Sequence, residues 1–475
     1  MIRRVSGTSV TYTIAIIGGG FSGAILATEL LRGGNPAITV LLIDREGCPG
    51  RGVAYSTHFA GHLLNVTARN MSALAEDGSH FLRWAREHYS DQTQPDDYLP
   101  RRAYGKYVES TLCEAIEDNP ARFEWKRDEA LSITPGESGV MVLLRSGLTI
   151  QADAVVLALG NFPPKHLTLP GWNDLSRRFV SNPWAVSALD EIAPENSVLL
   201  IGSGLTSVDV AISLRSRGFF GKMHMLSRHG LLPQTHKPAG QWPARWDHPP
   251  TRRVRSLLRL IRTEVAKAEK QNCDWRAVID SVRPFTQSIW RSLPQEERRR
   301  FLRHLRAYWD AHRHRVAPEI GTLLETEIAQ GRLEIHSGRI TEYRENGDSV
   351  EVGFRDRGQD ESEKLCVDYV INCTGPDDNC RRVNSPLLSD LLNRKLVRQD
   401  PLFLGLDTAD NAALLDACGV PSDFLYAVGP LRKGSLWETI AVPEIRVQVA
   451  ELASHLLSRF EQRYAENFVS EQAVA

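Results

Sequence analysis

Residues 14–23 read Ile-Ala-Ile-Ile-Gly-Gly-Gly-Phe-Ser-Gly, an apolar run that leads into a glycine-rich turn. In such a stretch Gly18 allows a tight turn, Gly20 lets the backbone approach a pyrophosphate, and Gly23 lets the next helix pack closely on the strand. The helix expected over 24–32 then points its free amide groups at phosphate oxygens. The stretch therefore predicts a Rossmann-like dinucleotide-binding unit.

An acidic residue stands where the ribose of a bound dinucleotide is expected. Residues 39–43 form the next expected strand, and Asp44 follows it, 21 positions after Gly23. A carboxylate at this spacing accepts hydrogen bonds from the adenosine ribose and repels a ribose 2′-phosphate. Together with the N-terminal position of the loop, Asp44 favours FAD as the first nucleotide.

A second glycine-rich turn follows another apolar strand. Residues 198–207 read Val-Leu-Leu-Ile-Gly-Ser-Gly-Leu-Thr-Ser. Gly202 and Gly204 take the places of the first two glycines of the pattern, and Ser207 replaces the third. Serine is still small enough for close helix packing. Two such loops in one chain predict two bound dinucleotides, a flavin that is reduced by a nicotinamide.

The residues after the next strand differ between the two units. In the second unit a strand is expected over 222–226, and Ser227, Arg228 and His229 follow it with no acidic residue among them. Serine and arginine are the usual partners of a ribose 2′-phosphate, whereas a carboxylate would favour NADH. The pattern favours NADPH over NADH as the second nucleotide. The alternative is that Arg228 is a solvated loop arginine.

Two more apolar segments, 154–160 and 369–375, end in glycine. They resemble the returning strands of flavoproteins that bind two dinucleotides, so Gly160 and Gly375 are candidate cofactor-binding residues. Each segment could also be an ordinary buried strand with a turn glycine.

The expected fold class is α/β, with two Rossmann-like dinucleotide-binding domains and a helical insert. Residues 1–165 begin an FAD domain that is split in sequence, and residues 345–475 complete it. An NAD(P) domain over 196–345 is inserted between these parts and carries a helical segment at 251–328.

The helical segment is strongly basic. Residues 251–315 hold 17 Arg and Lys against 7 Asp and Glu. We interpret residues 251–328 as a lid over the flavin, whose arginines face an anionic substrate, because a guanidinium suits planar recognition of carboxylates. Arg313 and Arg315 are the preferred candidates. The alternative for most of these arginines is a solvated helix face.

Bulk composition argues against several classes of protein. The formal net charge is −1, so no global field selects nucleic acid. No apolar run reaches the roughly 18 residues that predict a transmembrane helix. The seven cysteines form no Cys-x-x-Cys pair, which argues against dithiol chemistry and suits a reducing cytoplasm. His312 and His314 alternate with arginines but bring no further ligands, so no metal is expected.

Six further stretches carry a family pattern: Gly50–Ser56, Leu63–Val66, Arg101–Tyr107, Ser227–Pro233, His312–Arg315 and Gly429–Thr439. With the two glycine loops they make the sequence resemble the FAD/NAD(P)-binding flavoproteins with two dinucleotide-binding domains, and especially the single-chain flavin monooxygenases. The resemblance covers nearly the whole chain. The branch that it resembles includes a bacterial flavoprotein urate hydroxylase and amino-acid N-oxygenases that act on aspartate.

This resemblance implies roles for three more residues. Gly429 is expected to lie at the flavin. Trp437 is expected to open a helix whose N-terminus faces the pyrimidine of the isoalloxazine, where amide groups stabilise negative charge. Asn65 is expected to bind the flavin or hold the substrate. The alternatives are that Trp437 is a core aromatic and that Asn65 is a buried turn-capping residue.

The expected function is that of an FAD-dependent, NAD(P)H-consuming monooxygenase. It would pass oxygen from O2, through a C4a-hydroperoxide of the flavin, to a small polar and anionic substrate, while the lid excludes water. Urate hydroxylation in purine degradation is the first specific expectation, and N-oxygenation of an aspartate-type amino acid is the second. The alternatives are a flavin-dependent NAD(P)H oxidoreductase that inserts no oxygen and a non-catalytic protein that uses the nucleotides structurally. A cytoplasmic location is expected, with a small-molecule substrate and O2 as partners and neither nucleic acid nor membrane.

Overall fold

The apolar run before the first glycine loop forms strand β1 (Tyr12–Ile17) in the computed structural model of the protein. Contacts divide the chain into two units. The first consists of residues up to Thr57, Thr67–Asn161 and the chain from Asp378 onward, and the second of His58–Val66 and Phe162–Asp377. The structure describes residues 11–136, 139–168, 170–171, 176–243, 246, 251–356, 359 and 361–474.

The first unit is built on a six-stranded sheet with the strand order β16-β17-β7-β1-β2-β3. Strand β1 pairs in parallel with β2 and β7, and β17 extends the parallel part beyond β7. The central strands are almost wholly buried and rich in valine, isoleucine and leucine, as parallel strands covered on both faces are. The remaining strands of this sheet are β2 (Ile38–Asp44), β3 (Phe123–Arg127), β7 (Ala154–Leu157), β16 (Ala413–Leu415) and β17 (Pro421–Ala427).

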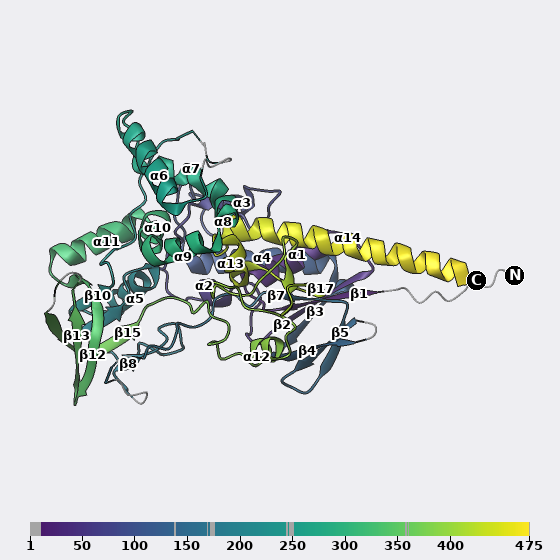
Figure 1. Ribbon diagram of the computed structural model, residues 1–475, viewed down its shortest axis with the longest axis horizontal. Helices are drawn as coiled ribbons and strands as arrows, with labels where there is room; N and C mark the ends of the chain where they lie inside the picture. Colours follow the sequence, from purple (N-terminus) through teal and green to yellow (C-terminus); the bar gives the residue numbers. More distant parts are fainter. Residues whose placement is uncertain are drawn as a thin grey trace. The chain divides into compact units, whose positions relative to one another are not determined.

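Helices cover this sheet, and a small antiparallel sheet lies beside it (Figure 1). Helix α1 packs against α4 and against the long α14. The helices of the unit are α1 (Phe21–Arg32), α2 (Gly52–Tyr55), α3 (His80–His88), α4 (Arg101–Asp118), α12 (Pro386–Asn393), α13 (Lys433–Leu436) and α14 (Val442–Val474). The small sheet consists of β4 (Ala130–Gly136), β5 (Gly139–Leu144) and β6 (Thr149–Ala152).

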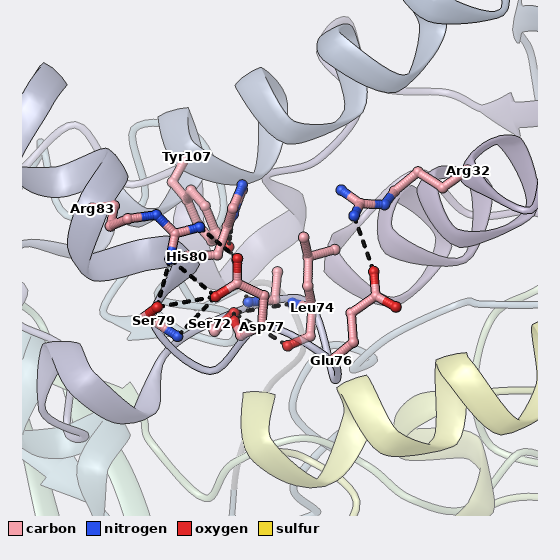
Figure 2. Close-up of polar contacts among 10 residues, drawn as sticks. Arg32, Ser72, Leu74, Glu76, Asp77, Ser79, His80, Arg83 and Tyr107 are labelled. Carbon is pink, nitrogen blue, oxygen red and sulfur yellow. Dashed lines mark hydrogen bonds and ion pairs between the residues drawn. The ribbon is translucent and has the colours of Figure 1, made fainter.

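A polar network fixes the loop that leads into α3 (Figure 2). Asp77 accepts hydrogen bonds from Ser79 and from the guanidinium of Arg83. The hydroxyl of Tyr107, on α4, lies 2.8 Å from Nδ1 of His80 and accepts a hydrogen bond from a backbone amide of the loop at 3.1 Å. Burial raises the pKa of Tyr107 to about 12 and lowers the pKa of His80. The neutral ring of His80 can therefore accept a hydrogen bond from the hydroxyl of Tyr107.

Replacing Tyr107 with phenylalanine is expected to lower the free energy of unfolding by about 1–3 kcal/mol, because the buried amide of Ala73 loses its acceptor. Urea denaturation followed by circular dichroism measures this change. Tyr89→Phe is the matched control, since that side chain is 46% exposed, and it should change stability by less than about 0.5 kcal/mol. Equal effects of the two substitutions would contradict the prediction.

The second unit contains a five-stranded parallel sheet with the order β11-β10-β9-β15-β8. Its strands are β8 (Phe179–Val180), β9 (Val198–Ile201), β10 (Met223–Ser227), β11 (Leu333–Ser337) and β15 (Tyr369–Asn372). Helix α5 (Leu205–Ser216) follows the second glycine loop. The charged segment near residue 350 forms an antiparallel sheet whose apolar face packs into the core of this unit. That sheet contains β12 (Arg339–Asn346), β13 (Ser349–Arg355) and β14 (Ser362–Val367).

The basic segment of the second unit is helical, as its sequence predicts (Figure 1). Its helices are α6 (Val254–Glu269), α7 (Trp275–Val282), α8 (Thr286–Ser292), α9 (Gln295–His304), α10 (Arg306–Arg313) and α11 (Pro318–Ala329). Trp246, Val278 and Val282 are buried in a core of its own, with Trp242 and Trp309 packed against it. Among the helices of the described ranges, none combines the length and apolar character needed to span a bilayer.

The division into units differs from the predicted domain limits at three places. The main stretch of the second unit begins at Phe162, whereas residues up to 165 are predicted in the FAD domain and the NAD(P) domain is predicted to begin at 196. Residues 345–377, predicted to complete the FAD domain, lie in the second unit, because β15 pairs with β9 there. The segment His58–Val66, predicted within the first part of the FAD domain, also belongs to the second unit. Its His62 ring lies 2.7 Å from the hydroxyl of Ser213 on α5.

The two units share one further detail. An aspartate directly precedes the last central strand of each, Asp153 before β7 and Asp368 before β15. The amide of Thr13 donates to Asp153 at 2.9 Å, and the amide of Ser197 donates to Asp368 at 2.6 Å. Each carboxylate therefore ties this strand to the start of the strand that carries the glycine loop.

Candidate functional site

Two glycines of the first loop, Gly18 and Gly23, leave no room for a side chain. The φ of Gly18 is +106°, and a Cβ atom there would lie 2.4 Å from the carbonyl oxygen of Ala158. A Cβ atom on Gly23 would lie 1.9 Å from the carbonyl oxygen of Gly18. Side chains at either position would collide with backbone, and residues other than glycine rarely adopt such a φ. The turn and the close approach of α1 both require glycine.

Asp44 lies at the end of β2 beside this loop. Its carboxylate accepts hydrogen bonds from the amide of Gly19 and, at 2.6 Å, from the amide of Glu46. An ionised carboxylate has about four lone-pair sites, so Asp44 can hold the loop and still accept a ribose hydroxyl. The sequence pattern predicts only a contact between Asp44 and the ribose. In the structure Asp44 also accepts a hydrogen bond from the loop amide of Gly19.

A second pair of glycines lies against the first loop. The amide of Gly50 donates to the carbonyl oxygen of Gly19 at 2.6 Å, and a Cβ atom on Gly52 would lie 3.0 Å from the Cα atom of Gly20. Glycine has no side chain, so the backbone at Gly19–Gly20 and at Gly50 and Gly52 can approach a pyrophosphate closely. The loop, the start of α1 and Asp44 therefore fit the adenosine diphosphate half of FAD.

Gly429 also lies at the start of α1. Its φ is +77°, and a Cβ atom there would lie 2.7 Å from Oγ of Ser22. The hydroxyl of Thr439 donates to the carbonyl oxygen of Gly429 at 2.9 Å, and the amide of Gln448 on α14 donates to Thr439 at 2.8 Å. This buried chain of hydrogen bonds fixes Gly429 beside Ser22 at the start of α1.

Trp437 does not open a helix, contrary to the expectation from the resemblance. It follows the short helix α13, has a φ of +61°, and is buried, while α14 begins only at Val442. The ammonium group of Lys433 lies 5.7 Å from the centre of its ring. The positive φ ends the helix at this point, because a residue in that conformation cannot continue the right-handed turn.

The second loop repeats the contact of the first. Gly202 has a φ of +123°, and a Cβ atom there would lie 2.5 Å from the carbonyl oxygen of Cys373. A Cβ atom on Gly204 would meet no atom within 4 Å, so this side of the loop is open to an incoming phosphate group. Ser207, on the first turn of α5, is fully buried where the first loop has its third glycine.

The returning segments of the two units also correspond. Gly160 has a φ of +65° and lies two residues after Ala158, while Gly375 has a φ of +81° and lies two residues after Cys373. Each glycine thus turns the chain just beyond the carbonyl group that packs on a loop glycine. Burial raises the pKa of the Cys373 thiol to about 12, so this cysteine stays protonated and is not a nucleophile.

The turn after β10 is tied to the second loop. The hydroxyl of Ser203 lies 2.7 Å from the hydroxyl of Ser227 and 2.6 Å from the carbonyl oxygen of Leu231, and the amide of Gly230 donates to Ser227 at 3.0 Å. Arg228 is exposed on this turn. The turn therefore presents hydroxyl and guanidinium groups beside the loop, the chemistry that a 2′-phosphate requires.

The three predicted catalytic residues lie around one histidine of the second unit. The carbonyl oxygen of Asn65 accepts a hydrogen bond from Nε2 of His236 at 3.0 Å. Burial, and then the positive charges of Arg315 and Arg313, lower the pKa of His236 to about 4. His236 is therefore neutral at pH 7 and donates from Nε2, which leaves Nδ1 with its lone pair.

Arg315 is a brace between α7 and α10. Its side chain is only 3% exposed and donates to the carbonyl oxygens of His312 and Arg276 and to the carboxylate of Asp280, at 2.9, 3.4 and 3.0 Å. Three of its five donors are thus used by the protein. These contacts favour a positioning role for Arg315 over the direct contact with substrate that its sequence pattern suggests.

Two residues of this region, His236 and Arg276, are not predicted from the sequence. Arg276 is buried, donates to the carbonyl oxygen of Thr235 at 2.9 Å and pairs with Asp274 at 3.1 Å. Its guanidinium lies 4.4 Å from the ring centre of Trp275. A Trp-Arg pair in a basic segment was the only local signal for Arg276, and His236 had none, because its neighbours come from distant parts of the sequence.

Replacing His236 with glutamine is expected to make the protein less sensitive to acid. The pKa of His236 is near 4 in the folded state and about 6.5 in the unfolded chain, so the unfolded state binds one more proton between these values. The free energy of unfolding therefore falls as pH falls from about 6.5 to 4. His236→Gln should reduce this slope by up to about 1.4 kcal/mol per pH unit.

Urea denaturation at several pH values, followed by tryptophan fluorescence, measures the slope. His304→Gln is the control because that residue is exposed on α9, and it should keep the wild-type slope. A His236 variant with the wild-type slope would show that this imidazole titrates normally.

Residues 15–162 match a protein family described as FAD-NAD(P)-binding. This segment contains the first glycine loop, Asp44 and Gly160. The match supports binding of a dinucleotide by the first unit. No curated protein was found to match the sequence significantly.

Solved structures share this fold over nearly the whole chain. The reduced form of ornithine hydroxylase from Pseudomonas aeruginosa is 16% identical, with a TM-score of 0.62 over 95% of this chain and 100% of that chain. L-lysine 6-monooxygenase from Pseudomonas syringae is 18% identical, with a TM-score of 0.63 over 94% and 99%. The ornithine N-hydroxylase of Kutzneria sp. 744, with reduced FAD, NADP+ and L-ornithine, is 16% identical, with a TM-score of 0.60 over 94% and 99%. At these identities the likeness shows the fold, an α/β fold with two Rossmann-like units.

Proposed function

We propose that this chain is an FAD-dependent, NAD(P)H-consuming monooxygenase that hydroxylates a nitrogen atom of an amino-acid-type substrate. The observation that carries the proposal is the matched pair of loop glycines, Gly18 and Gly202, each of which excludes a Cβ atom against a returning strand. Two such loops supply places for a flavin and for its reductant. The likeness to ornithine and lysine hydroxylases along at least 94% of this chain adds the reaction class.

In this proposal the first unit holds FAD. The amides at the start of α1 and the loop glycines take the diphosphate, and Asp44 takes the ribose. The segment fixed by Thr439 and Gln448 brings Gly429 to the same helix end. When bound, the flavin supplies the chemistry that activates O2, and the protein supplies orientation and the exclusion of water.

The second unit holds the nicotinamide nucleotide in this proposal, and its turn favours NADPH over NADH. Arg228→Ala is expected to raise the KM for NADPH by at least about tenfold while leaving the KM for NADH unchanged, because only NADPH has the charged group that a guanidinium recognises. Steady-state oxidation of the two nucleotides measures the ratio. Arg339→Ala, another exposed arginine of this unit, should change neither value. If Arg228→Ala left the ratio of the two KM values unchanged, Arg228 would be a solvent-exposed arginine that does not contact the nucleotide.

The substrate is proposed to be an amino acid whose carboxylate is recognised by the helical insert. Arg313 and Arg315 are buried close enough to His236 to lower its pKa, and Arg276 donates to the carbonyl oxygen of the preceding Thr235. Asp274 and Asp280 pair with Arg276 and Arg315, so the three arginines carry one positive charge more than these two carboxylates balance. The same charge would suit urate, the substrate that we expected first. Amino-acid N-oxygenation, our second expectation, is favoured because the three similar structures described above are, by their names, hydroxylases or monooxygenases of ornithine or lysine.

A substrate screen on the purified protein tests the proposal. Bound FAD is read from its absorption spectrum, and NADPH consumption is then followed with ornithine, lysine, aspartate and urate, with hydrogen peroxide and hydroxylamine products measured alongside. An amino acid that accelerates NADPH consumption and yields a hydroxylamine supports the proposal. If urate alone accelerated NADPH consumption, urate hydroxylation would be favoured over amino-acid N-oxygenation.

Two results would reject a monooxygenase. NADPH oxidation that no substrate accelerates, with peroxide as its only oxygen product, would favour the non-oxygenating oxidoreductase. A protein that binds both nucleotides but does not turn over would favour a structural use of them.

A further inference from the structure

Two histidines and a glutamate meet on neighbouring strands of the second unit, away from both glycine loops in sequence. His224 lies on β10, and Glu334 and His336 lie on β11, the edge strand of the parallel sheet. His224 and Glu334 are direct partners in the strand register, and His336 follows on the same face because it is two residues further along. The register alone therefore brings all three side chains together.

The three donor atoms form a small triangle. Nδ1 of His224 lies 3.1 Å from Nε2 of His336 and 3.4 Å from Oε2 of Glu334, and Nε2 of His336 lies 3.9 Å from the same oxygen. Ligands at about 2.0–2.1 Å from a tetrahedral zinc ion lie about 3.3 Å from one another. The triangle thus has nearly the dimensions of one face of a zinc coordination sphere.

Neighbouring residues hold this arrangement. The second carboxylate oxygen of Glu334 pairs with the ammonium group of Lys222 at 2.5 Å, which leaves Oε2 directed at the imidazoles. The ring of Phe354 packs on His336 with 5.3 Å between ring centres. Contacts that orient the ligating side chains are characteristic of metal sites, where they fix the ring and carboxylate positions.

We propose that His224, Glu334 and His336 bind one divalent transition-metal ion of the zinc type. Imidazole nitrogen and carboxylate oxygen suit Zn2+ and Ni2+, whereas Mg2+ prefers an all-oxygen shell. The side chain of Glu334 is 44% exposed and that of His336 is 20% exposed, so an ion can enter from solvent and complete its sphere with water. No local pattern predicts the site, because His224 and His336 are 112 residues apart.

The bound ion would join the edge strand to its neighbour next to the nucleotide turn. Ser337 follows His336, and a Cβ atom on Gly230 would lie 3.3 Å from the Cβ atom of Ser337. The amide of Gly338 donates to the carbonyl oxygen of Ser227 at 2.8 Å. The metal is therefore expected to stiffen the support of the turn that carries Arg228.

Metal titration of the tag-free, full-length protein with its cofactor bound tests the proposal. After removal of metals with a chelator, isothermal titration with Zn2+ should show one site, and Mg2+ at the same concentration should show none. His336→Gln and Glu334→Gln should each weaken Zn2+ binding by at least roughly tenfold. His304→Gln, an exposed histidine of the same unit, should bind Zn2+ like the wild type.

Thermal unfolding gives an independent measurement. Zn2+ should raise the Tm of the wild type and of His304→Gln, but not that of the two ligand variants, because a ligand stabilises only the state that binds it. Circular dichroism establishes whether each variant folds. If His336→Gln does not fold, Glu334→Gln still tests the site, because it changes an exposed side chain. A wild type that fails to bind Zn2+, or equal binding by all variants, would show that the two imidazoles share only a hydrogen bond.

Discussion

Alanine at position 18 is expected to abolish FAD binding. The added methyl group would lie 2.4 Å from the carbonyl oxygen of Ala158, and Gly18 has a φ of +106°, which alanine rarely adopts. Backbone must move on both sides, and the loop then loses the shape that receives the diphosphate. We expect the Gly18→Ala protein to be purified without flavin colour. Its affinity for FAD should fall by at least about 100-fold, which corresponds to about 2.7 kcal/mol of binding free energy.

The corresponding change in the second unit separates the two nucleotides. Gly202→Ala places its methyl group 2.5 Å from the carbonyl oxygen of Cys373, so it should keep bound FAD but lose NADPH-dependent flavin reduction by about the same factor. Gly78→Ala is the control, because a Cβ atom there meets nothing within 4 Å, and it should bind both nucleotides. Circular dichroism establishes that each variant is folded. A yellow Gly18→Ala protein would contradict the assignment of FAD to the first loop.

Replacing Arg315 with alanine is expected to have the second largest effect. The variant loses the hydrogen bonds to His312, Arg276 and Asp280 that join α7 to α10. Because charged hydrogen bonds contribute about 1.5–3 kcal/mol each and Asp280 is half exposed, we expect a loss of about 3 kcal/mol in the free energy of unfolding. Substrate-dependent NADPH oxidation should fall at least about tenfold, while FAD remains bound, because the insert that carries the proposed substrate groups is loosened.

Two further variants distinguish bracing from charge. Arg315→Lys keeps the positive charge but not the planar fork, so it should recover only part of the stability and activity. Arg299→Ala removes an exposed arginine from α9 and should resemble the wild type. If Arg315→Ala kept full activity and full stability, the proposed positioning role of Arg315 would be wrong.

The parts of the structure that follow from local pattern were predictable from the sequence. Gly18, Gly202 and Asp44 lie where glycine spacing and strand length place them, because a phosphate-binding turn imposes a fixed distance between strand and helix. The helical character of the basic segment also follows from its sequence. In these cases neighbours in sequence supply the deciding contacts.

The parts that depend on distant pairing were not predictable. Residues 345–377 join the second unit because β15 completes its sheet, and the sequence near residue 345 carries no sign of that pairing. The cluster around His236 draws on Asn65, Arg276 and Arg315, which only the tertiary fold brings together. The family resemblance predicts that Trp437 begins a helix, but with a φ of +61° this residue ends one.

The interrupted first unit has a consequence for the order in which the protein is made. Strand β7 is synthesised before the main stretch of the second unit, Phe162–Asp377, but β17, its partner in the sheet, follows only after Asp377. During translation the edge of β7 therefore stays unpaired while more than 200 residues emerge from the ribosome, and an open edge invites pairing with other chains. The inserted unit can finish folding first. A nascent chain thus passes through a stage in which the second unit is complete and the first still waits for its last strands.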